Sequence, residues 1–583
     1  MAHDFIRNAS IVFLDIETNS KHDHIWCCGT KKGDEVIIWT EAKKLSEYLS
    51  RDDIIVMHNG ISFDAPILNR LWNLKIRSSQ CRDTLVMSRL MNPNRESGHS
   101  LAAWGKSLGK NKIDYKRVWH RIHKLEYDKN STLPFDQPHH KLLHKYCIRD
   151  VEVLERVYYA LENEKRIYGF SDKSIQLEHE VATIISRQER RGFRLDVPYT
   201  MVLASEFRDK AAIIEQELQQ LFPPIVTERI SEKTGKKLTD KIEVFNPGSR
   251  QQIAKRLIEL GWKPRKKTEK GSVIVDETTL AEISTNARYA RKPVLVSVAA
   301  KLQEYLLLSK RHSQVQSWLD VVQEDGRVRG KVITNGAVTG RMTHHSPNMA
   351  QVPSSSSPYG EECRQCWTVD DGYKLVGIDA SGLELRMLAH YMEDKDYVRE
   401  VCEGDIHTKN QNAAGLQTRP QAKTFIYAFL YGAGPAKIGS IVGGKEKEGK
   451  RLINTFLDNT PSLKTLRTKV ERLAASGFLT GLDERQLHVR SAHAALNTLL
   501  QSAGAIVMKQ ALILLNKKIR KAKLDAHFVA NVHDEWQMEV LAKDAEAAGK
   551  MAVEAITEAG TTLGLRCPLT GEYKVGLNWA ETH

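Results

Sequence analysis

The chain has 583 residues and a formal net charge of +14, and its 41% hydrophobic and 27% charged residues are typical of globular proteins. This length predicts roughly three or four domain-sized units, and the composition excludes a mostly disordered chain. No uninterrupted apolar run approaches ~18 residues, so we predict no membrane span. The eight cysteines are too few for a disulfide framework, and we interpret the single CxxC of Cys363 and Cys366 as chance rather than as a zinc site. Without a signal peptide, the expected location is a reducing cytoplasm.

The excess of basic residues favours a partner with a phosphate backbone, because clustered Lys and Arg release condensed counterions when they bind nucleic acid. The alternative is a basic surface that only keeps the chain in solution. Motifs must decide between the two.

Strand and helix patterns alternate over residues 1–160, which predicts a compact α/β unit. Helical patterns cover residues 174–220 with a break at Gly192, and they return from Gln251 and over 294–322. Residues 231–241 are predicted to be a short basic polar loop between helical segments. Strands return after Gly326, a helical stretch covers 407–476, and an α/β portion ends the chain. In the N-terminal unit, the predicted strands cover 10–14, 36–40 and 53–57, and the predicted helices cover 65–74 and 140–164.

Four acidic residues of the N-terminal unit have the spacing of a metal site. Asp15 and Glu17 lie two residues apart at the end of an apolar strand, so both side chains point to one face. Asp64 is carried by a helix that follows a turn, and Tyr146 and Asp150 share a helix face because they are four residues apart. Four carboxylates repel one another unless hard cations neutralise them, and Mg²⁺ prefers such oxygen ligands. Two ions there would activate a water, oriented by Tyr146, and stabilise the leaving oxygen of a phosphodiester.

The order of these motifs, DxE then NxxxFD then YxxxD, resembles that of the DEDD-type proofreading 3′→5′ exonucleases. Each motif alone is as often a solvated strand edge or a helix cap. The ordered set therefore predicts a nuclease site.

A second acidic group is predicted in the C-terminal half. Asp379 ends an apolar strand, and Asp534 and Glu535 lie at the turn of a hairpin. Apolar and polar residues alternate from Trp536 to Val540, which predicts a half-buried second strand. Either aspartate alone is compatible with an ordinary turn residue.

A predicted helix between these segments carries a basic and aromatic stripe. Arg419, Lys423, Tyr427 and Tyr431 recur every four residues and therefore share one helix face, and Pro420 is tolerated in the first turn. The helix N-terminus adds partial positive charge beside the two cations, which suits a triphosphate. The axial rise of ~18 Å is about the length of a nucleotide plus its templating base. Two tyrosines on such a stripe suit base stacking better than a solvated surface.

Together these segments resemble the motifs of family A (DNA polymerase I-like) DNA polymerases, and the resemblance is closest to the replicative polymerases of short-tailed phages. It covers nearly the whole chain. Asp379–Arg386, Arg419–Gly432 and Val532–Glu535 correspond to motifs A, B and C, and the supporting segments are Thr339–Arg341, Pro347–Pro353, Gly404–Thr408 and His493–Ala505.

The resemblance implies a multidomain α/β and α+β fold, in which an RNase H-like α/β exonuclease domain precedes a right-hand polymerase with thumb, palm and fingers. It implies template-directed DNA synthesis with 3′→5′ proofreading. The implied boundaries are 1–170 for the exonuclease domain, 171–325 for a mostly helical thumb, 326–395 for the first part of the palm, 396–504 for the fingers and 505–583 for the second part of the palm.

The resemblance also implies the metal sites. Asp379 and Asp534 would hold two Mg²⁺ ions with the help of the Ala380 carbonyl, and His533 and Glu535 would support the primer terminus and the metal site. Mn²⁺ is the expected substitute for Mg²⁺. The exonuclease ions would be held by Asp15, Glu17, Asp64 and Asp150.

The remaining implied roles concern the nucleotide and the template. The residues expected to grip the incoming triphosphate are His407, Arg419 and Lys423. Tyr427 would line the sugar pocket and tolerate a missing 3′-hydroxyl, and Glu384 would exclude a 2′-hydroxyl. Tyr431 would occupy the template-base stacking position, and Arg341 and Gln501 would reach minor-groove acceptors that all four base pairs share.

The expected partners are primer–template DNA and dNTPs, with a helicase-primase and a single-stranded DNA-binding protein as candidates. A monomer in the cytoplasm of a phage-infected bacterium is expected, without membrane contact. The exonuclease motifs begin at residue 15, which leaves no room for a 5′-nuclease domain and favours a replicative role. The best-known phage relative recruits host thioredoxin through a large thumb insertion, whereas here that stretch shrinks to residues 231–241, so a thioredoxin partner is not expected. The lysines predicted to contact the duplex backbone instead are Lys233, Lys236, Lys237 and Lys241.

Two alternatives stay open. One is a repair or gap-filling polymerase on the same scaffold, which processivity and strand displacement would distinguish. The other is a 3′→5′ exonuclease or DNA-binding protein with an inactive polymerase half, against which the complete ligand sets argue.

Overall fold

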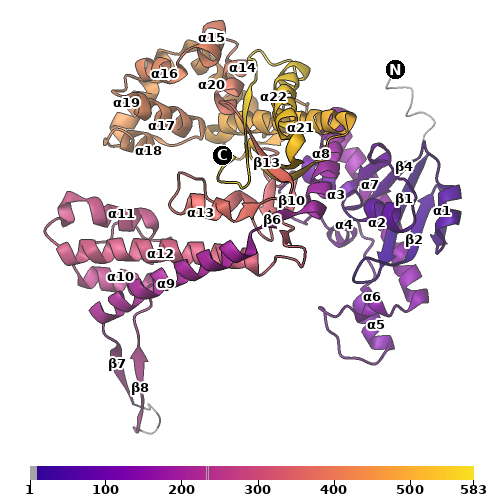
Figure 1. Cartoon of the computed structure of the whole chain (residues 1–583), viewed down its shortest axis with the longest axis horizontal. Coiled ribbons are helices and arrows are strands. Elements are labelled where there is room, and N and C mark those ends of the chain that lie inside the picture. The colour runs from indigo at the N-terminus through magenta and orange to yellow at the C-terminus, as the bar shows by residue number, and fades with distance from the viewer. Residues whose placement is uncertain (1–9, 231–232, 234) are drawn as a thin grey trace.

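The computed structural model describes residues 10–230, 233 and 235–583, which form several lobes (Figure 1). The N-terminal α/β lobe (indigo to purple) lies beside a second sheet that carries helices of the C-terminal half (orange to yellow). A helical lobe (magenta) projects away from both and ends in a two-stranded ribbon.

Strand β1 is the centre of a five-stranded mixed sheet in the N-terminal lobe, in the order β3-β2-β1-β4-β5. It pairs antiparallel with β2 and parallel with β4, which in turn pairs parallel with β5. Helix α7 packs against β1 and β2. The strands are β1 (Ile11–Thr18), β2 (Ile25–Lys32), β3 (Glu35–Trp39), β4 (Ile54–Met57) and β5 (Cys81–Asp83).

The first strand is longer than predicted. The prediction ended it at Leu14, but β1 continues to Thr18 because Ile16 and Thr18 are buried on the same face as Leu14. Asp15 and Glu17 therefore lie inside the strand, on its other face. The sequence did not predict β2, whose cysteine pair and glycine give a weak strand signal although most of the strand is buried.

The helices of this lobe place the other two acidic residues. Helix α2 begins at Asp64, and α7 carries Tyr146 and Asp150 and ends at Gly169, whose left-handed φ of 72° suits glycine. The helices are α1 (Ala42–Tyr48), α2 (Asp64–Leu71), α3 (Thr84–Met91), α4 (Leu101–Ser107), α5 (Tyr115–Ile122), α6 (Leu133–Asp136) and α7 (His140–Tyr168).

Helix α8 (Asp172–Arg191) joins the N-terminal lobe to the rest of the chain and ends at Gly192, the predicted break. A buried ion-pair network holds it in place. The Glu178 carboxylate accepts hydrogen bonds from Lys509 Nζ at 2.7 Å and from Arg485 Nη2 at 2.6 Å. Burial lowers the pKa of Lys509 to about 8 despite the nearby Glu178. The network therefore depends on complete pairing of its charges.

Replacing Glu178 with alanine is expected to lower the free energy of unfolding by about 3 kcal/mol, because two buried cations lose their shared carboxylate. The neighbouring pair of Glu180 and Lys517, at 3.0 Å, is partly exposed and provides the control. Glu180→Gln should change stability by less than about 1 kcal/mol. Urea unfolding measures both variants, and equal stabilities would contradict a role for the network.

The helical lobe is built on two long helices, α9 and α12, that pack along each other. Its core is mostly apolar and includes the fully buried side chains of Phe207 and Trp318. The elements are β6 (Phe193–Leu195), α9 (Val197–Leu221), β7 (Ile225–Ile230), β8 (Lys237–Glu243), α10 (Arg250–Glu259), α11 (Glu277–Thr285) and α12 (Pro293–Leu319).

The predicted basic loop over residues 231–241 is wrong in part, because β8 covers residues from Lys237 onward and pairs antiparallel with β7 (Figure 1). Val226 lies opposite Ile242 in this ribbon, and such β-branched cross-strand pairs favour strand pairing. Lys237 forms an ion pair with Glu228 at 3.0 Å. Ser231, Glu232 and Thr234 of the predicted loop lie outside the described residues.

The second sheet has the strand order β16-β17-β13-β18, all antiparallel. The hairpin of β16 and β17 turns at His533 and Asp534, as predicted. The elements between the helical lobe and the residues predicted as fingers are β9 (Arg327–Val328), β10 (Lys331–Ile333), β11 (Thr343–His345), α13 (Gly360–Gln365), β12 (Trp367–Thr368), β13 (Tyr373–Ala380) and α14 (Leu383–Met392). The other strands of the sheet are β16 (Ala526–Val532), β17 (Glu535–Leu541) and β18 (Gly571–Gly576), and helix α22 (Ala545–Thr562) packs against it.

Strand β17 is buried on both faces, so the prediction of a half-buried strand is wrong. Its polar face is covered because Gln537 accepts a hydrogen bond from Thr582 Oγ1 at 2.9 Å and Glu539 accepts one from Arg327 at 2.8 Å. The alternation of apolar and polar residues is real, but the polar partners come from distant parts of the chain.

The residues predicted as fingers form a cluster of helices and a small hairpin. The elements are α15 (Lys395–Glu403), α16 (Ile406–Ala414), α17 (Arg419–Leu430), α18 (Pro435–Ser440), α19 (Glu446–Asp458), α20 (Pro461–Leu473), β14 (Phe478–Thr480) and β15 (Gln486–His488). Helix α21 (Ala495–Ala522) then returns the chain to the second sheet.

One helical segment, Ala492–Ala522, is by length and composition alone apolar enough to cross a membrane, although no uninterrupted apolar run marks it in the sequence. Its most apolar window has a mean hydropathy of 1.5 and is 78% buried inside the protein, as in the core helix of a folded lobe. All eight cysteines, including Cys363 and Cys366, are free thiols.

Candidate active sites

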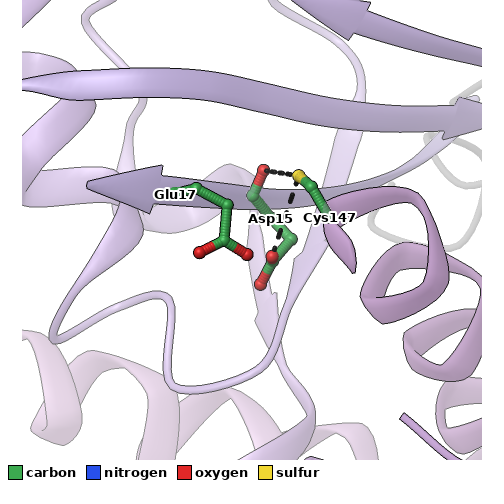
Figure 2. Close-up of side chains that lie close together, drawn as sticks. All are labelled: Asp15, Glu17 and Cys147. Carbon is green, nitrogen blue, oxygen red and sulfur yellow. Dashed lines mark hydrogen bonds between the residues drawn. The ribbon is translucent and has the colours of Figure 1, made fainter. Parts of the chain in front are cut away.

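The N-terminal carboxylates come together on one face of the first sheet. Figure 2 shows Asp15 and Glu17 projecting from the same side of β1 while Cys147 approaches from α7. Ligand atoms of these three residues lie within 4.8 Å of one another. Asp64 is held next to this strand because its Oδ1 accepts a hydrogen bond from the Ile16 amide at 3.1 Å.

The electrostatics of this cluster favour a bound cation. Burial and the charges of Asp150 and Asp64 raise the pKa of Asp15 well above its ordinary value. Burial and Asp15 do the same for Glu17, and burial raises the pKa of Asp64 to about 7. Oδ1 of Asp150 is buried without a hydrogen-bond partner. Four carboxylates with an unpaired buried oxygen fit the oxygen ligand set of Mg²⁺.

Lys112, which the sequence did not identify, completes the cluster. Its ammonium group lies 2.5 Å from Asp150 Oδ2 and 5.0 Å from the centre of the Tyr146 ring. Burial lowers the pKa of Lys112, but Asp150 and Asp15 outweigh it and raise the pKa overall. Burial and the charge of Asp150 raise the pKa of the Tyr146 hydroxyl, so the two side chains are neighbours, as their shared helix face suggested. Nothing in the local sequence around Lys112 predicts this ion pair.

Cys147 is a second residue that the sequence did not identify. Its thiol donates to the Asp15 carbonyl at 3.6 Å and lies 4.0 Å from Oδ2 of the same residue (Figure 2). A Cβ at Gly29 would lie 2.8 Å from this sulfur, so β2 can approach α7 only with glycine at that position. Cys147 thereby packs directly beneath the acidic residues of β1.

The second acidic group lies where β13 meets the β16–β17 hairpin. Asp379 pairs in register with Glu535, and the Ala380 amide donates to the Asp534 carbonyl at 3.2 Å. Burial and the charges of Asp534 and Glu535 raise the pKa of Asp379 to about 7. His533 holds a left-handed φ of 56° in the turn that presents Asp534. Two adjacent, partly exposed aspartates again fit a divalent cation.

Glu535 is buried and its carboxylate is already occupied. It accepts hydrogen bonds from the Trp579 indole and from Gln537 at 2.7 Å, and His583 lies 3.2 Å away. Burial raises the pKa of Glu535, but the bond from His583 and the charge of Arg364 outweigh it and lower the pKa. Glu535 is thus next to Asp379 in the sheet, but its carboxylate is held by Trp579 and His583 of the C-terminal segment. The sequence did not reveal these partners.

The predicted stripe lies on α17, which begins with a capping box of Thr418 and Gln421. Arg419 and Lys423 are exposed, and Tyr427 lies deeper, with its ring 6.2 Å from that of His407. Arg419 pairs with Asp405 at 2.7 Å. Nδ1 of His407 is buried without a hydrogen-bond partner, which leaves it available to a ligand.

Tyr431, the last residue of the predicted stripe, lies one residue beyond the end of α17, and its side chain is 48% exposed. Its hydroxyl donates to Glu384 Oε1, which also accepts a hydrogen bond from Arg341 at 3.2 Å. Three residues that were predicted separately from three segments are therefore in contact. Gln501 lies on α21, half-buried, and Arg341 and His533 line one small pocket with residues of α21.

Comparison with known proteins identifies the family. Residues 218–581 match the model of DNA polymerase family A. The chain is 34% identical to the DNA-directed DNA polymerase of Escherichia phage T7 over 664 aligned residues, which cover 92% of this chain and 94% of the relative. It is 42% identical to the DNA-directed DNA polymerase of Escherichia phage Phieco32 over 243 residues, 36% of this chain and 40% of the relative.

The structure resembles the polymerase domain of Pol1 from M. smegmatis, solved in complex with DNA primer-template and dNTP. The TM-score is 0.78, with 18% sequence identity, over 100% of this chain and 97% of the other. This likeness confirms the predicted fold of thumb, palm and fingers. By sequence and by fold, the chain belongs to DNA polymerase family A and is a DNA-directed DNA polymerase.

Proposed function

We propose that the chain is a replicative DNA polymerase that also removes misincorporated nucleotides at a separate 3′→5′ exonuclease site. The observation that supports this most strongly is the presence of two acidic clusters in different lobes. One gathers around Asp15 and Asp150, and the other around Asp379 and Asp534. In each cluster burial and neighbouring carboxylates raise the pKa of at least one member, Asp15 in the first and Asp379 in the second, as in sites that require a cation.

For synthesis, Asp379 and Asp534 would hold the two ions, with the Ala380 carbonyl as a further ligand. Bound Mg²⁺ supplies charge neutralisation and lowers the pKa of the attacking 3′-hydroxyl. Arg419 and Lys423 would neutralise the phosphates, and the charge that develops on pyrophosphate would lie beside these exposed cations. His407 would donate from its unpaired Nδ1.

For proofreading, the carboxylates of β1, α2 and α7 would hold two ions, and Tyr146 would orient the attacking water. Lys112 neutralises Asp150 in the absence of metal and would give up that contact when a cation binds. Mn²⁺ has the same ligand preference as Mg²⁺ and is the expected substitute.

The proposed partners are primer–template DNA and dNTPs, with replisome proteins such as a helicase-primase as candidates, in the cytoplasm of a phage-infected bacterium. A repair or gap-filling role is the second candidate. Extension of a primed single-stranded circle separates the two, since a replicative enzyme would copy long stretches in one binding event.

A primer with a mismatched 3′ end tests the proposal as a whole. With Mg²⁺ and no dNTPs, the wild type should shorten this primer, and with dNTPs it should shorten it and then extend it. Extension without any shortening would contradict the proofreading function.

Replacing Glu384 with alanine is expected to raise ribonucleotide incorporation relative to deoxynucleotide incorporation roughly 10- to 100-fold, because the carboxylate would no longer occupy the space of a 2′-hydroxyl. Tyr431→Phe removes the hydrogen bond to Glu384 but keeps the ring, and it should change this ratio much less. Single-nucleotide kcat/KM values for dNTP and rNTP provide the measurement. An unchanged ratio in Glu384→Ala would exclude this carboxylate as the sugar filter.

The ribbon of β7 and β8 is proposed to contact the duplex backbone, since Lys233, Lys236, Lys237 and Lys241 are all exposed. Replacing all four with glutamine should weaken duplex binding and lower the slope of log Kd against log salt by about 2 or more, at roughly 0.9 per lost phosphate contact. Lys237 is paired with Glu228, so its share should be the smallest. Unchanged processivity and salt dependence would refute this contact.

A further inference from the structure

A thiol lies among the acidic residues of the first sheet and has no role in the reaction proposed above. Ligand atoms of Asp15, Glu17 and Cys147 all lie within 4.8 Å of one another (Figure 2). In the part of the chain that the structure describes, no other three acidic, cysteine or histidine side chains converge this closely. The cluster therefore offers a cation sulfur as well as oxygen.

The Cys147 sulfur is directed at the acidic residues. Its thiol donates to the Asp15 carbonyl at 3.6 Å, and the sulfur lies 4.0 Å from Asp15 Oδ2 (Figure 2). Helix α7 packs closely on β1 and β2, because a Cβ at Gly29 would lie 2.8 Å from this sulfur. A sulfur fixed beside a carboxylate in this way needs little rearrangement to share a cation with it.

The alternative is that Cys147 is only a small apolar residue of the core. It does belong to a small buried cluster, whose other members are Cys27, Tyr115, Trp119 and Leu143. A buried cysteine often has no other role than such packing. Packing alone, however, would be served equally well by an alanine or a valine, neither of which places a metal ligand beside Asp15.

The ligand set decides which cation the cluster binds best. Mg²⁺ prefers oxygen ligands, whereas a thiolate selects Zn²⁺ and related transition metals. Zn²⁺ is usually held by four ligands, and a mixed set of thiolate and carboxylates is suitable. A fourth ligand is available from Asp150, whose Oδ1 is buried without a hydrogen-bond partner.

We propose that Cys147 gives the N-terminal cluster a second metal preference, in which Zn²⁺ binds to Asp15, Glu17 and the Cys147 thiolate and displaces Mg²⁺. Binding releases the thiol proton to the solvent and involves no change of oxidation state. This inference rests on the proposed exonuclease function, since that function uses Mg²⁺ at the same carboxylates. Zn²⁺ should therefore slow primer shortening at concentrations that leave primer extension unchanged.

The test uses Co²⁺ as the probe, because it accepts the same kinds of ligand as Zn²⁺. A bond between Co²⁺ and a thiolate gives a charge-transfer band in the near ultraviolet, which carboxylates do not give. Co²⁺ is titrated into the full-length protein without Mg²⁺ and with a phosphine as the reductant. The wild type should show this band, saturating at about one equivalent of Co²⁺, and Cys147→Ala should not show it.

A second variant and two controls keep the result specific to this cluster. Asp15→Ala retains the thiol but lacks its neighbouring carboxylate, and its Kd for Co²⁺ should rise at least about tenfold. The other thiols that lie near one another are Cys402 and Cys567, with sulfurs 3.7 Å apart, and the pair of the CxxC motif. Cys402→Ser and Cys363→Ser should therefore keep the band. Thermal melts show which variants fold.

Inhibition by Zn²⁺ provides the second readout. The Zn²⁺ concentration that halves primer shortening, measured for each protein against its own rate without Zn²⁺, should rise at least about tenfold in Cys147→Ala. Equal midpoints in the wild type and Cys147→Ala would overturn the proposal.

Three spectroscopic results would also overturn it. These are a charge-transfer band that persists in Cys147→Ala, a band that disappears in Cys402→Ser or Cys363→Ser, and Co²⁺ binding by Asp15→Ala that is as tight as that of the wild type. If the wild type binds Co²⁺ through Cys147 but never shortens a primer with Mg²⁺, the thiolate site stands and the proofreading proposal fails.

Discussion

Replacing Asp534 with alanine is expected to reduce template-directed extension on the order of 10³-fold or more, while primer shortening stays within about twofold of the wild type. Asp534 and Asp379 are the two aspartates at the junction of β13 and the hairpin turn. Of the neighbouring carboxylates, Glu535 is already occupied by its own hydrogen bonds and Glu572 lies opposite Asp379 on β18. Loss of either aspartate leaves one of the two carboxylates to hold two ions. Extension is measured with Mg²⁺ and dNTPs, and shortening with Mg²⁺ alone.

The activity of this variant is not expected to fail through unfolding. The pKa of Asp379 in the folded protein is about 7, above its ordinary value of 3.8. In the metal-free protein the free energy of unfolding therefore falls as the pH rises from the ordinary pKa to about 7, because the unfolded chain loses this proton first. Removing Asp534 removes one cause of the raised pKa. In EDTA at pH 8 the variant should therefore melt no lower than the wild type.

Glu558→Ala provides the matched control, since it removes an exposed charge of α22 that pairs with Lys518 at 2.9 Å. It should leave extension unchanged. Extension by Asp534→Ala within tenfold of the wild type would show that this aspartate does not hold the catalytic ions.

Spacing within one element predicted much of both sites. The two-residue interval of Asp15 and Glu17 fixed their common face whether the strand ended at Leu14 or at Thr18. The four-residue intervals on α7 and α17 likewise placed Tyr146 beside Asp150 and Arg419 above Lys423. These relations follow from the geometry of a single strand or helix and need no tertiary information.

Contacts between elements could not be predicted in this way. Lys112 reaches Asp150 from a loop, and Tyr431 reaches Glu384 across 47 residues of sequence. Two partners of Glu535, Trp579 and His583, come from the C-terminal segment. Each of these depends on how lobes pack, which no local pattern encodes.

The prediction for the ribbon of β7 and β8 was wrong for a different reason. The stretch from 231 to 241 is polar and was assigned to a loop by its composition. The apolar residues that favour strands, such as Val226, Ile230 and Ile242, lie mostly outside that stretch and are exposed by 58%, 65% and 65%. A window that began at Pro224 would have included the apolar residues of both strands.

Replacing Asp15 with alanine is expected to reduce primer shortening on the order of 10³-fold or more and to leave extension unchanged. Asp15 lies among Glu17, Asp64 and Asp150, and each of these carboxylates has a raised pKa. Loss of the central ligand should prevent the remaining three from holding two ions in place. The matched control is Glu41→Ala, which removes an exposed carboxylate of the same lobe that pairs with Lys44.

The pH dependence distinguishes a metal site from a merely structural cluster. The folded pKa of Asp64 is about 7, so below that pH a proton competes with Mg²⁺ for this carboxylate, and binding of the ion releases the proton. The Mg²⁺ concentration needed for half-maximal shortening should therefore fall as the pH rises from 6 to 8, and excess Mg²⁺ should restore the wild type at pH 6. It should not restore Asp15→Ala at any pH, because the missing ligand cannot be replaced by mass action. A midpoint that does not move with pH would mean that these carboxylates do not bind the ion, and the proofreading site would have to lie elsewhere on the chain.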